Sequence, residues 1–178
     1  MSIDFTALFS IGGKLPNAAD LPQALSQLGM GLQQVIELWK EHWQPQEWAL
    51  TAPQGFSFAR QCIEVVGPGG FAFDFMPAAV SVYHCSRWGT FITDEEHCAR
   101  LRHACFEIAQ FLGSEIAIYL PESAPNGFFE GSSLQQIEGE LRGHFGEPAP
   151  SIRSINDAFD GYDLHRSCYY VDRFADLK

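Results

Sequence analysis

The 178-residue chain is 46% hydrophobic and 19% charged, a composition that excludes intrinsic disorder and can fill one core, so we expect a single domain over residues 1–178. Acidic residues outnumber basic ones by 22 to 11, which gives a formal net charge of −11. Because a field of that sign repels phosphate backbones and anionic lipids, the charge disfavours direct binding to nucleic acid or to a membrane surface.

The first predicted helix starts after Asp20, a helix-capping residue, carries Pro22 in its first turn and ends before Pro45. Gly29 and Gly31 lie inside this span, and each weakens a helix by roughly 1 kcal/mol relative to Ala. Their presence therefore predicts close packing of the helix against another element. The apolar side chains that form the predicted buried stripe are Leu25, Leu28, Leu32, Val35, Ile36, Trp39 and Trp43.

A β region follows the first helix. Residues 57–66 end in an apolar run, the Gly-Pro-Gly-Gly segment at 67–70 is typical of a turn, and residues 71–76 alternate Phe with Ala, Asp and Met. This two-residue period is that of a half-buried strand, so the two runs predict a hairpin. Residues 80–85 alternate in the same way and predict a third strand, which completes an antiparallel meander.

A second helix is predicted from Thr93 to Gly113. Thr93 and Glu96 have the spacing of a capping box, in which each side chain bonds the free backbone N–H group of the other residue. Gly113 is a natural left-handed stop for the helix. The strand predicted next, over residues 116–120, is apolar on both faces and is therefore expected to lie centrally in the sheet.

The remaining third of the chain predicts one more helix and one more strand. A loop rich in Pro, Gly and acids, residues 121–131, precedes a helix that Ser132 or Ser133 opens. A Pro-rich link, a turn at 160–161 and a strand over 167–171 follow. The whole order predicts an α+β fold with a mainly antiparallel sheet of about five strands packed with three helices.

Cysteine usage and the N-terminus predict the compartment. The five cysteines are odd in number, lack any CxxC spacing and lie among apolar residues, which indicates buried, reduced thiols in a reducing compartment. The N-terminus has an early acid, Asp4, and no basic region, so we expect no signal peptide. No apolar run approaches the ~18 residues of a membrane span. We therefore expect a cytoplasmic protein.

Side chains able to bind a metal are densest at His84, Cys85, His97, Cys98 and His103. A paired ligand site on a helix uses residues three or four apart, whereas His97 and His103 are six apart and point in different directions. The spacing therefore predicts no metal site. The Gly-rich turn matches neither a P-loop nor a dinucleotide-binding fingerprint, so we expect no cofactor.

Catalytic residues are not predicted. The sequence has no Gly-x-Ser-x-Gly nucleophile elbow, and Ser132 and Ser133 lie at a helix start, where capping explains them. One alternative stays open, an enzyme with a dispersed site around His84, His103 and Glu107. In that alternative the i, i+4 pair of His103 and Glu107 orients an imidazole.

Two segments are candidate contacts for a protein partner. The first is the run of three carboxylates at 94–96, although carboxylates in the first turn of a helix also stabilise its macrodipole. The second is the loop at 121–131, where two adjacent Phe rings lie between two Glu residues. Aromatic anchors rimmed by charge are common at interfaces, and burial of the rings under the loop is the alternative. The candidate partner-binding residues are Asp94, Glu95, Glu96, Glu122, Phe128, Phe129 and Glu130.

The layout of the middle and the end of the chain is similar to that of a known family. The segments that carry this resemblance are 88–93, the helix ending at Gly113, 119–121, 146–148 and 169–170. They resemble small immunity proteins of bacterial polymorphic-toxin systems, and immunity protein family 52 in particular, over roughly residues 80–175. The resemblance implies an α+β protein that binds and neutralises a cognate toxin, commonly a nuclease of restriction-endonuclease type delivered by a secretion system such as type VI. It identifies no inhibitory residues.

The leading hypothesis is a non-enzymatic immunity protein, a monomer or small homo-oligomer, that binds a toxin with a basic surface. An acidic inhibitor suits the basic cleft of such a toxin, because complementary fields raise association rates. Solubility alone is the alternative explanation of the acidic charge. Besides the enzyme, a general adaptor or chaperone is a further alternative function.

Overall fold

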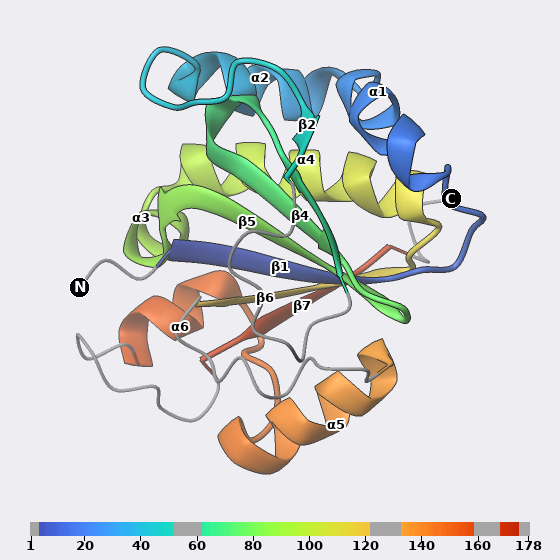
Figure 1. Ribbon diagram of the computed structural model, residues 1–178. Coiled ribbons are helices and arrows are strands. Elements are labelled where there is room, and N and C mark those ends of the chain that lie inside the picture. The colour runs from blue at the N-terminus through green and yellow to red at the C-terminus, as the bar shows by residue number, and fades with distance from the viewer. Residues whose placement is uncertain (1–3, 52–61, 122–132, 159–167, 175–178) are drawn as a thin grey trace.

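The computed structural model describes residues 4–51, 62–121, 133–158 and 168–174 (Figure 1). In these ranges a seven-stranded sheet has its neighbours in the order β2-β3-β4-β5-β1-β6-β7, and each neighbouring pair is antiparallel. The strands are β1 (Asp4–Ser10), β2 (Ala49–Leu50), β3 (Ile63–Val66), β4 (Phe71–Phe75), β5 (Ala79–Arg87), β6 (Ile116–Pro121) and β7 (Tyr170–Arg173). The helices are α1 (Leu21–Ser26), α2 (Met30–Trp39), α3 (Trp88–Thr93), α4 (Glu95–Leu112), α5 (Leu134–Phe145) and α6 (Ile152–Ala158).

The α+β class and the antiparallel sheet are confirmed, but the predicted numbers of elements are wrong. The described residues form seven strands and six α-helices instead of about five and three. β1 escapes sequence-based prediction because Phe5, Phe9 and all residues between them are buried, so the strand has no alternation of polar and apolar side chains. β2 has two residues, α3 six and α6 seven, which is too short for a clear periodic signal.

The single helix predicted between Asp20 and Pro45 is wrong. The chain forms two helices there, α1 and α2, which residues 27–29 separate. The predicted stripe is nevertheless buried where helix forms, at Leu25 in α1 and at Leu32, Val35 and Ile36 in α2. Helix α2 ends at Trp39, so Trp43 lies beyond it and is 42% exposed.

The predicted meander is confirmed, because β3 pairs with β4 and β4 pairs with β5. A 3₁₀ turn at Pro68–Gly70 joins β3 to β4, and Gly69 has a φ of 68°, in the left-handed region that favours glycine. A Cβ atom at Gly69 would lie 2.6 Å from the Cα atom of Ile36, so this turn packs directly against α2. The predicted strand residues 57–61 lie outside the described residues.

Residues 116–120 were predicted to lie centrally in the sheet; β6 is an interior strand, between β1 and the edge strand β7, and is buried from Ala117 onward. Strand β7 overlaps the strand predicted at 167–171. The turn predicted at 160–161 lies outside the described residues.

The helix caps differ in part from prediction. The capping box predicted for Thr93 and Glu96 is wrong, because Thr93 ends α3 and its hydroxyl donates a hydrogen bond to the Gly89 carbonyl at 2.8 Å. Asp94 caps α4 instead, and its Oδ1 accepts a hydrogen bond from the His97 backbone N–H at 2.9 Å. Two other predictions are confirmed. Gly113 ends α4 in the left-handed conformation, and Ser133 opens α5 in a capping box with Gln136.

Helices cover both faces of the sheet (Figure 1). Phe5, Ala7 and Phe9 of β1 pack in the core under α2 and α4, whereas Leu8 packs in a second core together with the apolar face of α5. The two faces of β1 therefore pack against two different helical layers. Among the described helices, none has the length and apolar character that crossing a membrane requires.

Candidate functional site

Helices α2 and α4 run antiparallel in one layer, and this places the start of α4 beside the end of α2. At one end of the pair, the backbone N–H of Gly31 lies 2.9 Å from the Glu107 carboxylate. At the other end, the rings of Trp39 and His97 meet edge to face with centroids 6.4 Å apart. Side chains at the end of α2 and at the start of α4 therefore share one end of the molecule.

Glu107 has a structural task at the far end of this pair. Its Oε1 accepts a hydrogen bond from the Gly31 N–H and its Oε2 accepts one from the Leu32 N–H, each at 2.9 Å. The carboxylate thereby satisfies two of the free N–H groups at the start of α2 and lies at the positive end of the helix dipole. A Cβ atom at Gly29 would lie 2.4 Å from Glu107 Oε1, which confirms the close packing predicted from the two glycines.

The structure does not assemble His84, His103 and Glu107 into one site. His103 lies 3.8 Å from Glu107, and its side chain is 58% exposed. His84 is buried on β5 and contacts His97, which lies six residues or about 9 Å before His103 along α4. Since Glu107 is engaged with the backbone of α2, the dispersed enzyme site has no geometric basis in these contacts.

A hydrogen-bonded chain links β5 to α4 through His84, Ser86 and His97. Ser86 Oγ lies 2.6 Å from His84 Nδ1 and 2.8 Å from His97 Nε2. The Ser86 backbone N–H also donates to His84 Nδ1, at 3.1 Å, so this nitrogen is an acceptor and carries no proton. The Ser86 hydroxyl therefore donates to His84, and His97 Nε2–H donates to the hydroxyl.

These three hydrogen-bonded residues are of the types found in serine–histidine catalytic sites, but they are not accessible to a substrate. His84 and Ser86 are each 1% exposed, so solvent and substrate are kept from the hydroxyl. Burial, together with the nearby His97, lowers the pKa of His84 to about 3, which keeps the ring neutral at physiological pH. We therefore interpret the three residues as a buried hydrogen-bond network that links the sheet to α4.

Three of the cysteines are poorly suited to act as nucleophiles. Burial raises the pKa of Cys85 to about 12 and that of Cys98 and Cys168 to about 11. A thiol with such a pKa is protonated at neutral pH and reacts slowly. Within the part of the chain that the structure describes, no three His, Cys, Asp or Glu side chains gather as ligands for one metal ion.

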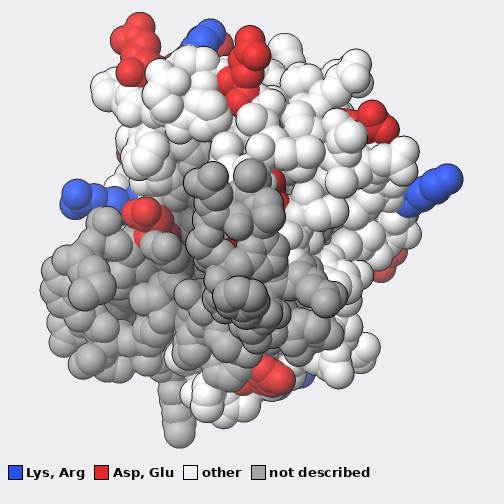
Figure 2. Space-filling view, viewed as in Figure 1, with Lys and Arg blue, Asp and Glu red and all other residues white. Residues whose placement is uncertain are grey.

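The shared end of α2 and α4 carries a group of carboxylates that we call the acidic end. Some of these carboxylates come from α4 and others from α2 or the turn after it. Arg100 lies between the two groups, because it pairs with Glu96 of α4 and borders the same hollow as Glu37 of α2. On the face drawn in Figure 2, acidic side chains gather at the top, over α2 and the turn that follows it. The members of the acidic end, all of them exposed, are Glu37, Glu41, Asp94, Glu95 and Glu96.

Cations offset the acidic end only in part. Lys40 pairs with Glu37 at 3.0 Å, and Arg100 pairs with Glu96. The other three carboxylates, those of Glu41, Asp94 and Glu95, have no ion pair among the described residues. Asp94 is also engaged in capping α4, so Glu41 and Glu95 in particular can act on an approaching charge.

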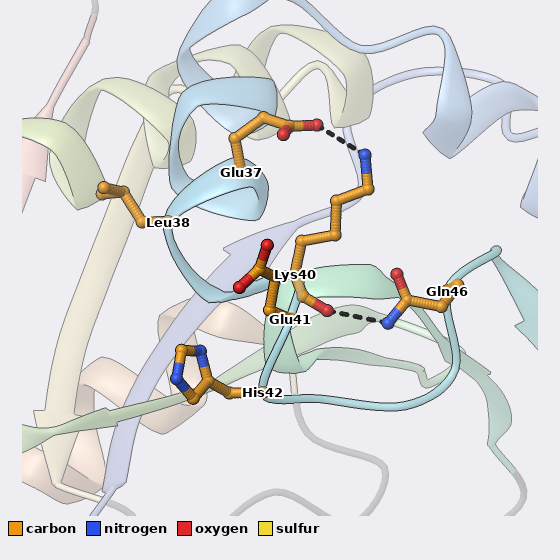
Figure 3. A pocket seen from close by; sticks show the side chains of 6 residues that line it. All are labelled: Glu37, Leu38, Lys40, Glu41, His42 and Gln46. Carbon is orange, nitrogen blue, oxygen red and sulfur yellow. Dashed lines mark hydrogen bonds and ion pairs between the residues drawn. The ribbon is translucent and has the colours of Figure 1, made fainter.

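A hollow lies beside the end of α2, and Figure 3 shows the side chains that line it. The hollow has a volume of about 350 Å³, and the Gln46 side chain closes it on one side by donating to the Lys40 carbonyl at 2.7 Å. Each side chain around it is exposed, so it is an open surface and not an enclosed substrate pocket. The lining residues are Glu37, Leu38, Lys40, Glu41, His42 and Gln46.

The structure describes part of the predicted contact set. Asp94, Glu95 and Glu96 lie on the surface at the start of α4, where Asp94 also caps the helix. The second predicted segment, with Glu122, Phe128, Phe129 and Glu130, lies outside the described residues. Sequence reasoning missed Glu37, which lies on α2, and Glu41, which lies in the turn that follows α2.

Comparison with models of known protein families found no match to this sequence, and comparison with curated protein sequences found none either.

Proposed function

We propose that this protein is an immunity protein that binds a cognate toxin and neutralises it through the acidic end. The toxin we envisage is a nuclease with a basic cleft, and the proposed inhibitor is a cytoplasmic protein of one domain. The observation that carries the proposal is the cluster of exposed carboxylates at the shared end of α2 and α4, three of which have no ion pair among the described residues.

The physical argument rests on charge complementarity. A cleft that grips phosphates is lined with Arg and Lys, and carboxylates that approach from several directions can pair with those cations. The acidic end offers such carboxylates from several elements, at Glu37 of α2, at Glu41 in the turn after α2, and at Glu95 and Glu96 of α4. The formal net charge of −11 adds long-range attraction toward a basic partner.

The resemblance of residues 80–175 to immunity proteins supports the same function from the sequence side. An enzyme is the weaker proposal, because Glu107 is bound to the start of α2 and Ser86 is closed to solvent. A binding role needs only the exposed surface, which requires no rearrangement.

The test begins with the protein encoded by the neighbouring gene. Expressed alone, that protein should stop growth, and co-expression of the 178-residue chain should restore growth and give a complex that co-purifies. The double variant Glu41→Lys/Glu95→Lys should lose rescue. A control with the same change of charge, Glu115→Lys/Glu140→Lys, alters one exposed carboxylate just before β6 and one in α5 and should retain rescue. A non-toxic neighbour, or rescue by both variants, would refute the proposal.

A further inference from the structure

An exposed apolar strip lies on α2, next to the acidic end. Met30 is 75% exposed and Leu38 is 48% exposed, although both belong to a helix that buries Leu32, Val35 and Ile36. Eight residues separate Met30 from Leu38, which is about 12 Å along the helix axis. Large apolar side chains exposed at helical spacing are typical of a surface that another element covers.

Met30 and Leu38 lie at the ends of a hollow between α2 and α4, which we call the α2 groove. The groove has a volume of about 450 Å³, and Gln33 and Gln34 form its middle. Arg100 of α4 forms its opposite wall and is held there by its ion pair with Glu96. The groove is therefore apolar at both ends and polar between them.

The α2 groove continues into the acidic end. Glu37 and Leu38 line the groove and also line the neighbouring hollow that contains Glu41 (Figure 3). A segment lying along α2 would thus meet an apolar side chain first at Met30 and again at Leu38, and would then meet carboxylates. This pattern is complementary to a segment with an apolar face and cationic flanks.

We propose that the α2 groove seats a basic amphipathic helix of the toxin, an inference that rests on the proposed function and identifies what the acidic surface receives. Residues seven apart on a helix are about 10.5 Å apart, close to the spacing of the two apolar ends. An extended segment fits less well, because the backbone groups of α2 and α4 are bonded within their helices and offer an incoming strand no partners. A helical segment needs no such partners, because its backbone N–H and C=O groups bond to one another.

Charge selects this occupant over the two other surfaces that could cover an apolar strip. A second copy of the chain would bring another formal charge of −11 against the first, and an anionic lipid surface would be repelled in the same way. A cationic helix is attracted by Glu41, which has no ion pair among the described residues, while its apolar face covers Met30 and Leu38.

The test uses two synthetic 18-residue peptides made of Leu, Lys and Ala in the same proportions. In the first, Leu residues recur at i, i+4, i+7 and i+11 and share one helical face; in the second, the same residues are scrambled so that no face forms. Fluorescence anisotropy of labelled peptide with the full-length protein measures affinity. We expect the amphipathic peptide to bind at least tenfold more tightly than the scrambled one.

The variant Leu38→Glu distinguishes binding in the α2 groove from binding by charge attraction alone. The substitution makes the surface more acidic, so charge alone predicts tighter binding of the amphipathic peptide, whereas loss of the apolar contact predicts binding at least fivefold weaker. Met30→Glu should act in the same direction. Equal binding of both peptides, tighter binding to Leu38→Glu, or no binding of the amphipathic peptide would overturn the groove proposal.

The outcomes also separate this inference from the proposed function. If both peptides bind equally and Glu41→Lys/Glu95→Lys weakens both, the acidic end still attracts cations and the groove is refuted alone. If neither peptide responds to that charge reversal, the proposed function loses its physical basis as well. Unchanged unfolding temperatures of the exposed-site variants serve as the control for folding.

Discussion

Glu107 of α4 lies within hydrogen-bonding distance of the Gly31 backbone N–H, at 2.9 Å, and this contact fixes where α2 starts. The same carboxylate bonds the next N–H, of Leu32, so one side chain joins α4 to the start of α2 although Glu107 is 76 residues from Gly31 in sequence. The contact holds the antiparallel pair in register. The position of the acidic end at the other end of the pair depends on it.

Glu107→Gln should therefore lower the free energy of unfolding by about 1–3 kcal/mol, because an amide has one acceptor oxygen and no charge to meet the helix dipole. Urea unfolding measures the change. His103→Gln is the matched control, since His103 is 58% exposed and lies 3.8 Å from the carboxylate; its effect should stay below about 0.5 kcal/mol. An equal loss in both variants would contradict the capping role.

Asp172 should be the most sensitive carboxylate of the sheet edge. Arg102 of α4 donates two hydrogen bonds to the Asp172 carboxylate, of 2.8 and 2.6 Å, and the Tyr119 hydroxyl donates a third hydrogen bond to it at 2.9 Å. Asp172 is 8% exposed but the Arg102 side chain is 41% exposed, so Asp172→Asn removes one member of a half-buried ion pair and should cost roughly 1–3 kcal/mol. Tyr119→Phe removes one hydrogen bond and should cost about 1 kcal/mol. Thermal or urea unfolding that ranks the two variants in the opposite order would refute this account.

His84 makes the stability of the protein dependent on pH. Its pKa is lowered to about 3 in the folded state, whereas the ordinary value of 6.5 applies to the unfolded chain. Between these values the unfolded state binds more protons, so the free energy of unfolding falls as the pH falls from about 6.5 toward 3, by at most about 1.4 kcal/mol per pH unit. The half-buried His97, whose pKa is also lowered by burial, adds to the effect in the same direction.

Urea unfolding of wild type and His84→Gln between pH 7 and pH 4 tests this dependence. The variant should be less stable at pH 7, because it loses the ring that packs against Phe71 and Trp39, and its stability should decline less steeply with acid. Identical slopes for the two proteins would show that His84 does not carry the effect.

The sequence predicted the elements whose patterns are complete within a few residues. The alternating Phe residues of β4, the apolar run of β6 and the Ser133 cap each contain their own signal. Elements that depend on distant residues were missed or misplaced. β1 packs into a core on each face of the sheet and so has no solvent-exposed face, and the break between α1 and α2 is stabilised by Glu107, which is 76 residues from Gly31.

The same division applies to the candidate site. The carboxylates at 94–96 were visible as a run in the sequence, whereas Glu37 and Glu41 joined them through the antiparallel packing of α2 on α4. The chain of His84, Ser86 and His97 was equally hidden, because β5 and α4 bring it together from two elements. Exposure of Met30 and Leu38 also follows from packing, since their residue types alone favour burial.

The most direct test of the acidic end as a binding surface is the association rate constant with the toxin encoded by the neighbouring gene, measured by stopped flow at several salt concentrations. We expect the rate constant of wild type to fall steeply with added salt. Glu41→Lys/Glu95→Lys should associate at least tenfold more slowly at low salt and with a weaker salt dependence, while Glu115→Lys/Glu140→Lys should remain within about threefold of wild type. Equal slowing by the two double variants would show that net charge alone sets the rate and would contradict a binding role for the acidic end.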